Sequence, residues 1–233
     1  MGRLIKSRKV FAASMWDDGL VTDLRLMEML RELKAPTAFA LNPARYGASR
    51  QLNNANPQFG QIISAAELKE FSDFEIVNHT ARHIDLTKLS LSGAEQEITE
   101  GRSRLEDIFQ RDVSGFCYPF GKHNSRIADI LRRNLYLYGR TCQHTDKKKN
   151  ADRMMLYASA KWDNQNYDAL IERTLQDRDG LIFWGHTYEM KEEKDWRTVR
   201  KLYEWLLTDK RVKLVTFKEM VVATTLQSPD SGV

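Results

Sequence analysis

Two histidines and a pair of aspartates are the residues of this sequence best suited to chemistry. His79 and His83 lie in the segment HTARH, and Asp17 and Asp18 lie in MWDDG. At a spacing of four, we expect both imidazoles to share one face of a helical turn and to reach one cation. Two nitrogens and one carboxylate leave coordination positions open for water and substrate, which is typical of a catalytic metal centre.

The two adjacent aspartates are expected to have different roles. One can bind the cation while its neighbour accepts a proton from the attacking water. Each motif also has a structural interpretation, because Asp-Asp-Gly is a common turn sequence and loop histidines can cap a helix. The combination of the two motifs favours the metal centre.

Groups of this kind follow several short apolar segments that predict buried strands. Each of four predicted strands is followed by a candidate site segment. The strand and the residues after it are 9–15 with Asp17 and Asp18, 75–78 with His79 and His83, 113–118 with Pro119, Phe120 and Gly121, and 181–184 with His186. The carboxyl ends of the strands of a parallel barrel open on one face, where loops from distant parts of the sequence converge. We therefore expect the four groups to meet.

Strand and helix patterns alternate along the chain, which predicts parallel strands with right-handed crossovers. Capping boxes at Ser64 and Ser92 predict two helix starts. We expect helices over residues 22–33, 92–110, 125–133, 166–176 and 195–208, and further strands over 37–41, 135–138, 154–158 and 212–216. Two architectures fit this α/β pattern, a small or incomplete (β/α) barrel and an open doubly wound sheet. A glycine-rich phosphate loop would favour the open sheet, and none occurs.

Composition limits the class of protein. The 233 residues are 42% hydrophobic and 29% charged with a net charge of +4, as in an ordinary globular protein. We expect no transmembrane segment, no signal peptide and a cytoplasmic location. The only basic run, residues 147–149, has acidic neighbours and does not favour nucleic acid as a partner. Cys117 and Cys142 make no disulfide framework, and the oligomeric state is not predicted.

Four segments resemble, in order and spacing, the motifs of the polysaccharide deacetylases (the NodB-homology domain, carbohydrate esterase family 4). MWDDG is similar to the family's TFDDG, HTARH to H[ST]xxH, FCYPFG to RxPY[G], and LIFWGH to the late motif that ends in a histidine. The resemblance implies a distorted or incomplete (β/α)7-8 barrel in a single domain over residues 1–226, followed by a flexible tail over 227–233. It also implies a divalent metal, Zn2+ first, with Co2+, Ni2+ and Mn2+ as alternatives.

The resemblance implies a role for each matched residue. Asp17 would be the general base, and Asp18 would bind the metal together with His79 and His83. His186 would be the general acid that protonates the leaving amine. The backbone N–H of Phe120 would help to hold the oxyanion. The residues expected to contact substrate are Tyr118, Pro119, His123, Trp162 and Trp184.

Two departures from the family's pattern concern the neighbours of the catalytic residues. Cys117 replaces the motif's arginine, which in the family orients and tunes the catalytic aspartate, so the environment of Asp17 is left open. We expect Cys117 to be a packing residue, with a nucleophile or metal ligand as the alternatives. The family's aspartate motif near a tryptophan is not evident, and residues 161–163 (KWD) match it poorly.

The predicted function is metal-dependent removal of an N-acetyl group from an amino sugar. The substrate would be an N-acylated sugar or oligosaccharide of a surface polysaccharide or its cytoplasmic precursor, for example in lipopolysaccharide O-antigen assembly. One alternative is a deformylase or another small-amide hydrolase with the same site. A second alternative is a non-catalytic carbohydrate-binding relative, which the replaced arginine would favour.

Overall fold

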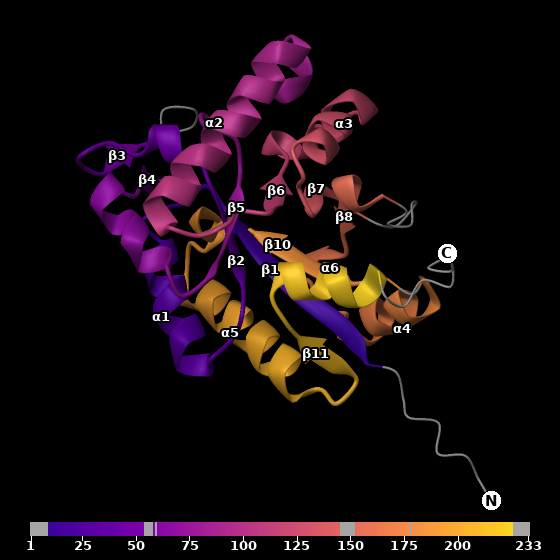
Figure 1. The fold of residues 1–233 in the computed structure, drawn as a ribbon. Coiled ribbons are helices and arrows are strands. Elements are labelled where there is room, and N and C mark those ends of the chain that lie inside the picture. Colours follow the sequence, from indigo (N-terminus) through magenta and orange to yellow (C-terminus); the bar gives the residue numbers. More distant parts are fainter. Residues whose placement is uncertain (1–8, 54–57, 59, 145–151, 178, 226–233) are drawn as a thin grey trace, which may run out of the picture.

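A parallel sheet forms the centre of the molecule, with helices around it (Figure 1). The computed structural model describes residues 9–53, 58, 60–144, 152–177 and 179–225, so the predicted tail and the basic run lie outside the described residues. The strands are β1 (Val10–Asp17), β2 (Ala38–Leu41), β5 (Glu75–Asn78), β6 (Gly115–Cys117), β7 (Tyr138–His144), β8 (Leu156–Ala158), β9 (Ala160–Lys161), β10 (Leu181–Gly185) and β11 (Val212–Leu214). Their order is β8-β7-β6-β5-β2-β1-β10-β9, and β11 also pairs with β1.

The sheet nearly closes on itself through the segment of residues 156–161. β8 at the start of this segment pairs with β7, and β9 at its end pairs with β10. Between them, the backbone N–H of Ser159 donates to the carbonyl of Ile182 at 2.8 Å, and Oγ of Ser159 accepts from the N–H of Ile182 at 2.9 Å. The result is a single-domain, distorted (β/α) barrel, which confirms the predicted fold class.

Alternation along β1 separates the barrel interior from the helix layer. Ala13 and Met15 pack inside the barrel against small residues of the other strands and against α6 (Phe217–Thr225). Trp16 faces outward, where its indole N–H donates to the hydroxyl of Tyr203 at 2.8 Å. Because side chains alternate along a strand, Asp17 points to the same side as Met15, above the packed interior. The alternation therefore positions the first site residue.

The remaining helices cover the outside of the sheet (Figure 1). They are α1 (Asp23–Leu33), α2 (Leu91–Phe109), α3 (Ser125–Arg133), α4 (Tyr167–Asp177) and α5 (Glu193–Thr208). Each agrees with a predicted helix to within a few residues. The capping box at Ser64 is also confirmed, and it opens a short 3-10 helix, Ala65–Phe71. The second predicted box is wrong, because Ser90 rather than Ser92 caps α2, accepting from the N–H of Gly93 at 3.2 Å.

One predicted strand and one connecting segment are described differently by the structure than by the sequence pattern. The strand predicted over residues 135–138 is wrong, because Leu135 has a left-handed backbone (φ 57°) and is 82% exposed. The strand β7 begins at Tyr138 instead and continues to His144. Between β2 and β5 the chain forms a short antiparallel hairpin, made of β3 (Gln51–Leu52) and β4 (Gln61–Ile62).

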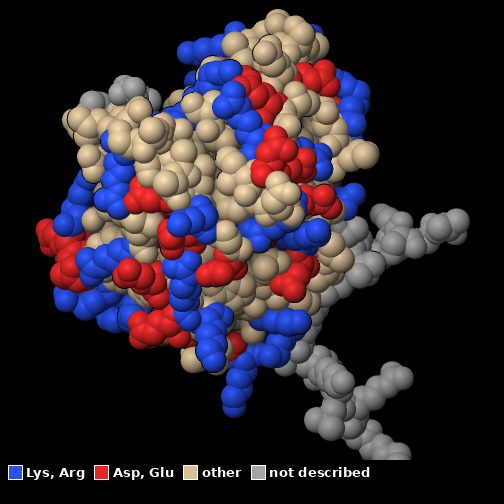
Figure 2. Space-filling view, turned by 60° about the vertical axis from the view of Figure 1, so that its left-hand side comes forward, with Lys and Arg blue, Asp and Glu red and all other residues tan. Residues whose placement is uncertain are grey.

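The surface carries charges of both signs. On the face shown in Figure 2, Lys and Arg are interspersed with Asp and Glu. Ion pairs of the surface include Arg25–Glu193 at 2.7 Å, Arg31–Asp73 at 2.8 Å and Arg200–Glu32 at 2.6 Å. Within the described ranges, every helix is too short or too polar to cross a membrane.

Candidate metal and catalytic site

A cavity of about 480 Å³ lies at the carboxyl ends of the strands. It brings together side chains that are far apart in the sequence, from β1, β7, β10 and the segments that follow β5 and β6. Its lining comprises Asp17, Asp18, Asn53, His79, His83, Tyr118, Phe120, Gly121, Arg140, Cys142, Trp184, His186 and Tyr188. The cavity therefore contains the two aspartates and three of the histidines that the sequence singled out.

Asp18, His79 and His83 form a group that fits a metal ion. Each offers one ligand atom, and these atoms lie within 4.8 Å of one another. Oδ1 of Asp18 is 3.7 Å from Nε2 of His79 and 3.4 Å from Nε2 of His83. Oδ1 of Asp18 is also buried without a hydrogen-bond partner in the described part of the chain. A buried carboxylate oxygen without a partner is costly, and a cation would satisfy it.

The imidazoles are held in the form that binds metals. The Nδ1 of His79 is 2.8 Å from the carbonyl of Cys117, which fixes the proton on Nδ1 and leaves the lone pair of Nε2 free for a cation. Burial lowers the pKa of His79 well below its usual value, and the neighbouring His83 lowers it further. Burial also lowers the pKa of His83. Both rings are therefore neutral, as metal ligation requires.

The two histidines meet on a turn that is not helical, contrary to the prediction from their spacing. Thr80 and His83 both have positive φ angles, 65° and 59°. The hydroxyl of Thr80 accepts from the N–H of His83 at 3.0 Å, and Oε2 of Glu97 accepts from the N–H of Arg82 at 3.1 Å. Backbone conformations of this kind cost energy and persist where the surroundings enforce them. The surrounding contacts, rather than helical periodicity, bring the two imidazoles together.

Asp17 has a buried cationic partner that the sequence analysis did not find. The guanidinium of Arg140 on β7 donates to Oδ1 of Asp17, and both side chains are almost completely buried. Burial opposes the charge on Arg140, but the Asp17 carboxylate outweighs it and raises the pKa of the guanidinium. Asp17 therefore lies beside a permanent positive charge despite the cysteine at position 117.

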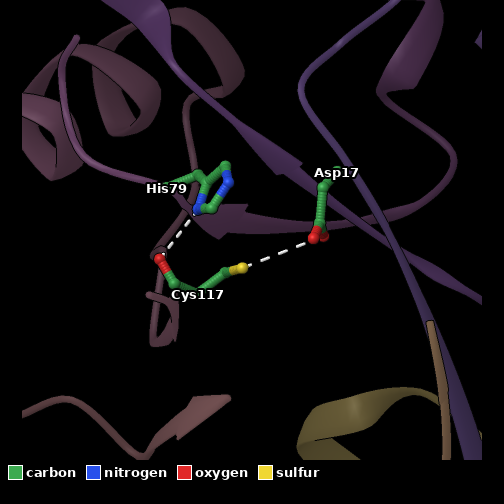
Figure 3. Close-up of side chains that lie close together, drawn as sticks. All are labelled: Asp17, His79 and Cys117. Carbon is green, nitrogen blue, oxygen red and sulfur yellow. Dashed lines mark hydrogen bonds between the residues drawn. The ribbon is translucent and has the colours of Figure 1, made fainter. Parts of the chain in front are cut away.

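Cys117 contributes a thiol and a carbonyl to the same region (Figure 3). Its Sγ lies 3.8 Å from Oδ1 of Asp17, and its carbonyl is the partner of His79. Asp17, His79 and Cys117 also offer ligand atoms within 4.8 Å of one another. Burial raises the pKa of the Cys117 thiol well above its usual value, so the thiol stays protonated. This favours packing and weak donation to Asp17 over a nucleophile.

His186 lies close to both aspartates, with its Nε2 4.0 Å from Oδ2 of Asp18. Its Nε2 is 3.9 Å from Oδ2 of Asp17, and its Nδ1 is 3.5 Å from Oε1 of Glu189. Burial alone would lower the pKa of His186, but the carboxylates of Glu189, Asp17 and Asp18 together raise it. Lys161 donates to Oε1 of Glu189 at 2.7 Å and Trp162 to Oε2 at 2.6 Å. The poorly matching segment KWD thus holds Glu189, which in turn faces His186.

Some of the other residues expected in the site line the cavity, and some do not. Tyr118 and Trp184 line the cavity, as does Phe120. Phe120 has a left-handed backbone (φ 58°) and is 55% exposed, and its ring centroid is 4.6 Å from that of His83. Three of the expected substrate contacts, Pro119, His123 and Trp162, do not belong to the cavity lining.

Contacts within the protein account for two of these three. The Nδ1 of His123 lies 3.0 Å from the carbonyl of Gly121, and Trp162 is buried against Glu189. Arg140 and Glu189 are the charged residues that the sequence analysis missed. The only sequence signal for Glu189 is its position three residues after His186. Arg140 gave none, because the strand that carries it was not recognised beyond Tyr138.

Comparison with known proteins gives one family match and several structural similarities. The family model described as polysaccharide deacetylase matches residues 5–139. The structure is similar to the Xyl-CE4 domain of a multidomain xylanase from the hindgut metagenome of Trinervitermes trinervoides, with 16% identity and a TM-score of 0.60 over 94% of this chain and 92% of that chain. A search of curated proteins gives no match.

Two further solved structures share the fold. A putative polysaccharide deacetylase from Mycobacterium smegmatis is 12% identical, with a TM-score of 0.63 over 96% of this chain and 92% of that chain. BA3943, a CE4 family pseudoenzyme from Bacillus anthracis, is 15% identical, with a TM-score of 0.57 over 92% of this chain and 66% of that chain. These identities establish the fold alone. Because the family model spans more than half of its residues, the chain belongs to the polysaccharide deacetylase family.

Proposed function

We propose that this protein is a metal-dependent hydrolase that removes the N-acetyl group from an amino sugar of a surface polysaccharide or of its precursor. The observation that carries the proposal is Oδ1 of Asp18, which is buried, lacks a hydrogen-bond partner in the described residues, and faces two neutral imidazoles. The cavity beside it also contains Asp17 and His186. A carboxylate and an imidazole beside a cation site are the groups that amide hydrolysis requires.

The donor set supports a divalent metal. Two imidazole nitrogens and one carboxylate oxygen suit Zn2+, and Co2+, Ni2+ and Mn2+ can use the same donors. When bound by Asp18, His79 and His83, the metal would polarise the acyl carbonyl and acidify the attacking water. The buried position of these ligands strengthens such electrostatic effects, because little water is present to screen them.

The residues around the metal site supply the proton transfers of the proposal. Asp17 accepts a proton from the attacking water, and His186 donates one to the leaving amine. Their side chains are 3.9 Å apart at Nε2 and Oδ2, so both can act on groups attached to one carbonyl carbon. The backbone N–H of Phe120, a residue of the cavity lining, is proposed to hold the oxyanion.

The cavity suits a sugar that carries a small acyl group. Trp184 and Tyr188 line it with aromatic rings near that of His186, at centroid distances of 5.5 Å and 4.9 Å. Aromatic faces stack on the apolar faces of sugar rings, and polar groups nearby fix their orientation. An N-formyl group would also fit such a site, so acetyl and formyl sugars are both included in the test.

The experiment measures metal and acid release together. We expect the protein, stripped with a chelator and reloaded with Zn2+, to release acetate from N-acetylated amino-sugar oligosaccharides. Asp17→Asn should bind the same amount of zinc and lose turnover, and His79→Ala should lose the zinc. Full turnover by Asp17→Asn would refute the assigned base. Formate as the only acid released would indicate a deformylase, and glycan binding with neither acid would indicate the non-catalytic alternative.

A further inference from the structure

Asp17 and Asp18 are two adjacent buried carboxylates, each 3% exposed. Two negative charges at this depth repel each other, and a counter-charge beside each carboxylate is needed to offset the repulsion and the cost of burial. A cation bound with His79 and His83 would be the counter-charge of Asp18, and the guanidinium of Arg140 is the counter-charge of Asp17. Arg140 is 1% exposed, and among the described lysines and arginines it is the one that is buried. Its only anionic partner in the described structure is Asp17.

The contact fixes which oxygen of Asp17 faces the cavity. Oδ1 accepts from Arg140 and lies 3.8 Å from the thiol of Cys117. Oδ2 remains on the side of His186, 3.9 Å from its Nε2. A carboxylate anchored through one oxygen presents the other in a fixed direction, which is what a base needs in order to meet the attacking water.

Strand register explains why the arginine comes from β7. Cys117 on β6 and Arg140 on β7 are direct partners in the parallel ladder. Paired residues on neighbouring strands project to the same side of the sheet, and here both side chains reach Oδ1 of Asp17. Arg140 is held further by Met15, whose Sδ is 3.3 Å from its Nε, and by the ring of Trp184, 5.5 Å from its Cζ. The side chains of Cys117 and Arg140 therefore share the space beside Oδ1 of Asp17.

We infer that Arg140 is the positioning residue for Asp17. Relative to the family motif, the arginine has moved to the neighbouring strand: Cys117 occupies the motif position on β6, and its ladder partner Arg140 on β7 supplies the guanidinium. The short side chain on β6 provides the room into which the arginine of β7 extends. Arg140 therefore does from the neighbouring strand what the arginine of the family motif would do from position 117. The inference rests on the proposed function in one respect, since it takes Asp17 as the base.

The first test removes the guanidinium and measures kcat, KM and zinc content. For Arg140→Ala we expect kcat to fall by about 100-fold, because the base loses its fixed orientation, with KM and zinc content little changed. Added guanidinium chloride should restore kcat by roughly tenfold, since the free ion can enter the emptied space. Arg25→Ala, which breaks an exposed ion pair with Glu193, is the control and should change none of the three quantities. An Arg140→Ala enzyme with wild-type kcat would overturn the inference.

The second test exchanges the residues at positions 117 and 140. It also tests whether Arg140 positions Asp17 in the case that Arg140→Ala does not fold. We expect Cys117→Arg and Arg140→Cys each to lose most of kcat, the first through overcrowding and the second through the lost charge. Combining the two substitutions should raise kcat by about tenfold above the better single variant. A double variant that is no better than either single variant would overturn the exchange.

A measurement without turnover separates this inference from the proposed function. Denaturant unfolding of Asp17→Asn, Arg140→Met and the double variant forms a double-mutant cycle. Strong coupling supports the pairing even if the wild type releases no acid, in which case only the proposed function fails. Additive effects on stability would show that the two residues do not act together, whatever the activity.

Discussion

Glu189 supports His186 from a position that no recognised motif contains. It is held by Lys161 and Trp162 through both carboxylate oxygens, and Oε1 is 3.5 Å from Nδ1 of His186. Burial alone would raise the pKa of Glu189, but His186, Lys161 and Trp162 together lower it to about 2. A negative charge fixed behind an imidazole orients the ring and favours its protonated form.

The role of this charge is tested by Glu189→Gln. The amide keeps the size of the side chain but removes the charge that faces His186, so we expect kcat to fall by about 10- to 100-fold. KM and zinc content should remain close to those of the wild type. Glu193→Gln is the matched control, because Glu193 pairs with Arg25 on the surface. Equal kcat values in the two variants would contradict the assigned role.

Residue types and spacing predicted the residues of the cavity but not the charges behind them. Asp17, Asp18, His79, His83 and His186 stand in recognisable segments, and the structure places all five in one cavity. Arg140 and Glu189 act through contacts across strands and loops. Which residues of β6 and β7 stand opposite each other depends on register, and no local pattern around an isolated arginine contains that information.

The turn after β1 shows how an element positions a ligand. Asp18 and Gly19 both have positive φ angles, 85° and 65°. The hydroxyl of Tyr46 donates to the carbonyl of Asp18 at 3.1 Å and accepts from the N–H of Asn42 at 3.0 Å. A side chain on Gly19 would collide with this hydroxyl. The glycine of the DDG motif is therefore required by the turn that directs Asp18 towards the histidines.

Substitution of this glycine should affect both stability and metal binding. For Gly19→Ala we expect a loss of roughly 1–3 kcal/mol in the free energy of unfolding and weaker zinc binding, because Tyr46 and Asp18 must move. Gly60→Ala is the control, since Gly60 also has a positive φ (80°) but open space around it. Gly60→Ala should lose only the part of the free energy of unfolding that comes from backbone strain at a positive φ, and it should bind zinc as the wild type does. Zinc titration and denaturant unfolding of both variants distinguish the two effects.

Periodicity located most elements and failed where loops imitate strands. α3 spans the predicted residues because its apolar positions recur at helical spacing and Asn124 caps its start. The apolar run at residues 135–138 resembled a strand, yet it begins with an exposed left-handed residue. The real strand β7 contains the charged Arg140 at a buried position, which is unlike the apolar pattern expected of a parallel strand.

At the scale of the whole molecule, the fold places a polar site above an apolar barrel interior. Small and apolar residues such as Ala13, Ala38 and Ala158 fill the interior, and α6 packs against them. The alternation of strands and helices predicted the parallel sheet and its crossovers. The bridging segment of residues 156–161 was not predictable from the sequence. Its first part, β8, pairs with β7, and its second part, β9, pairs with β10, and no local pattern marks the change of partner.

Asp23 links the charge state of the site region to the stability of the whole molecule. It is completely buried, accepts from the N–H of Leu20 at 2.8 Å and from the hydroxyl of Thr187 at 2.5 Å, and faces the charges of Asp18 and His186. Burial raises its pKa from 3.8 to about 7, and the hydrogen bonds only partly offset this. Between these values the folded protein holds a proton that the unfolded chain has lost.

Stability must therefore fall as the pH rises through this window, because the folded state binds more protons there. We expect wild-type protein to lose up to about 4 kcal/mol in the free energy of unfolding between pH 4 and pH 8, relative to Asp23→Asn. The asparagine can accept from Leu20 and donate to Thr187, so it keeps both contacts without titrating. Denaturant unfolding of the two zinc-free proteins at several pH values measures the difference. Parallel stability curves would mean that Asp23 is already ionised at pH 4 in the folded state.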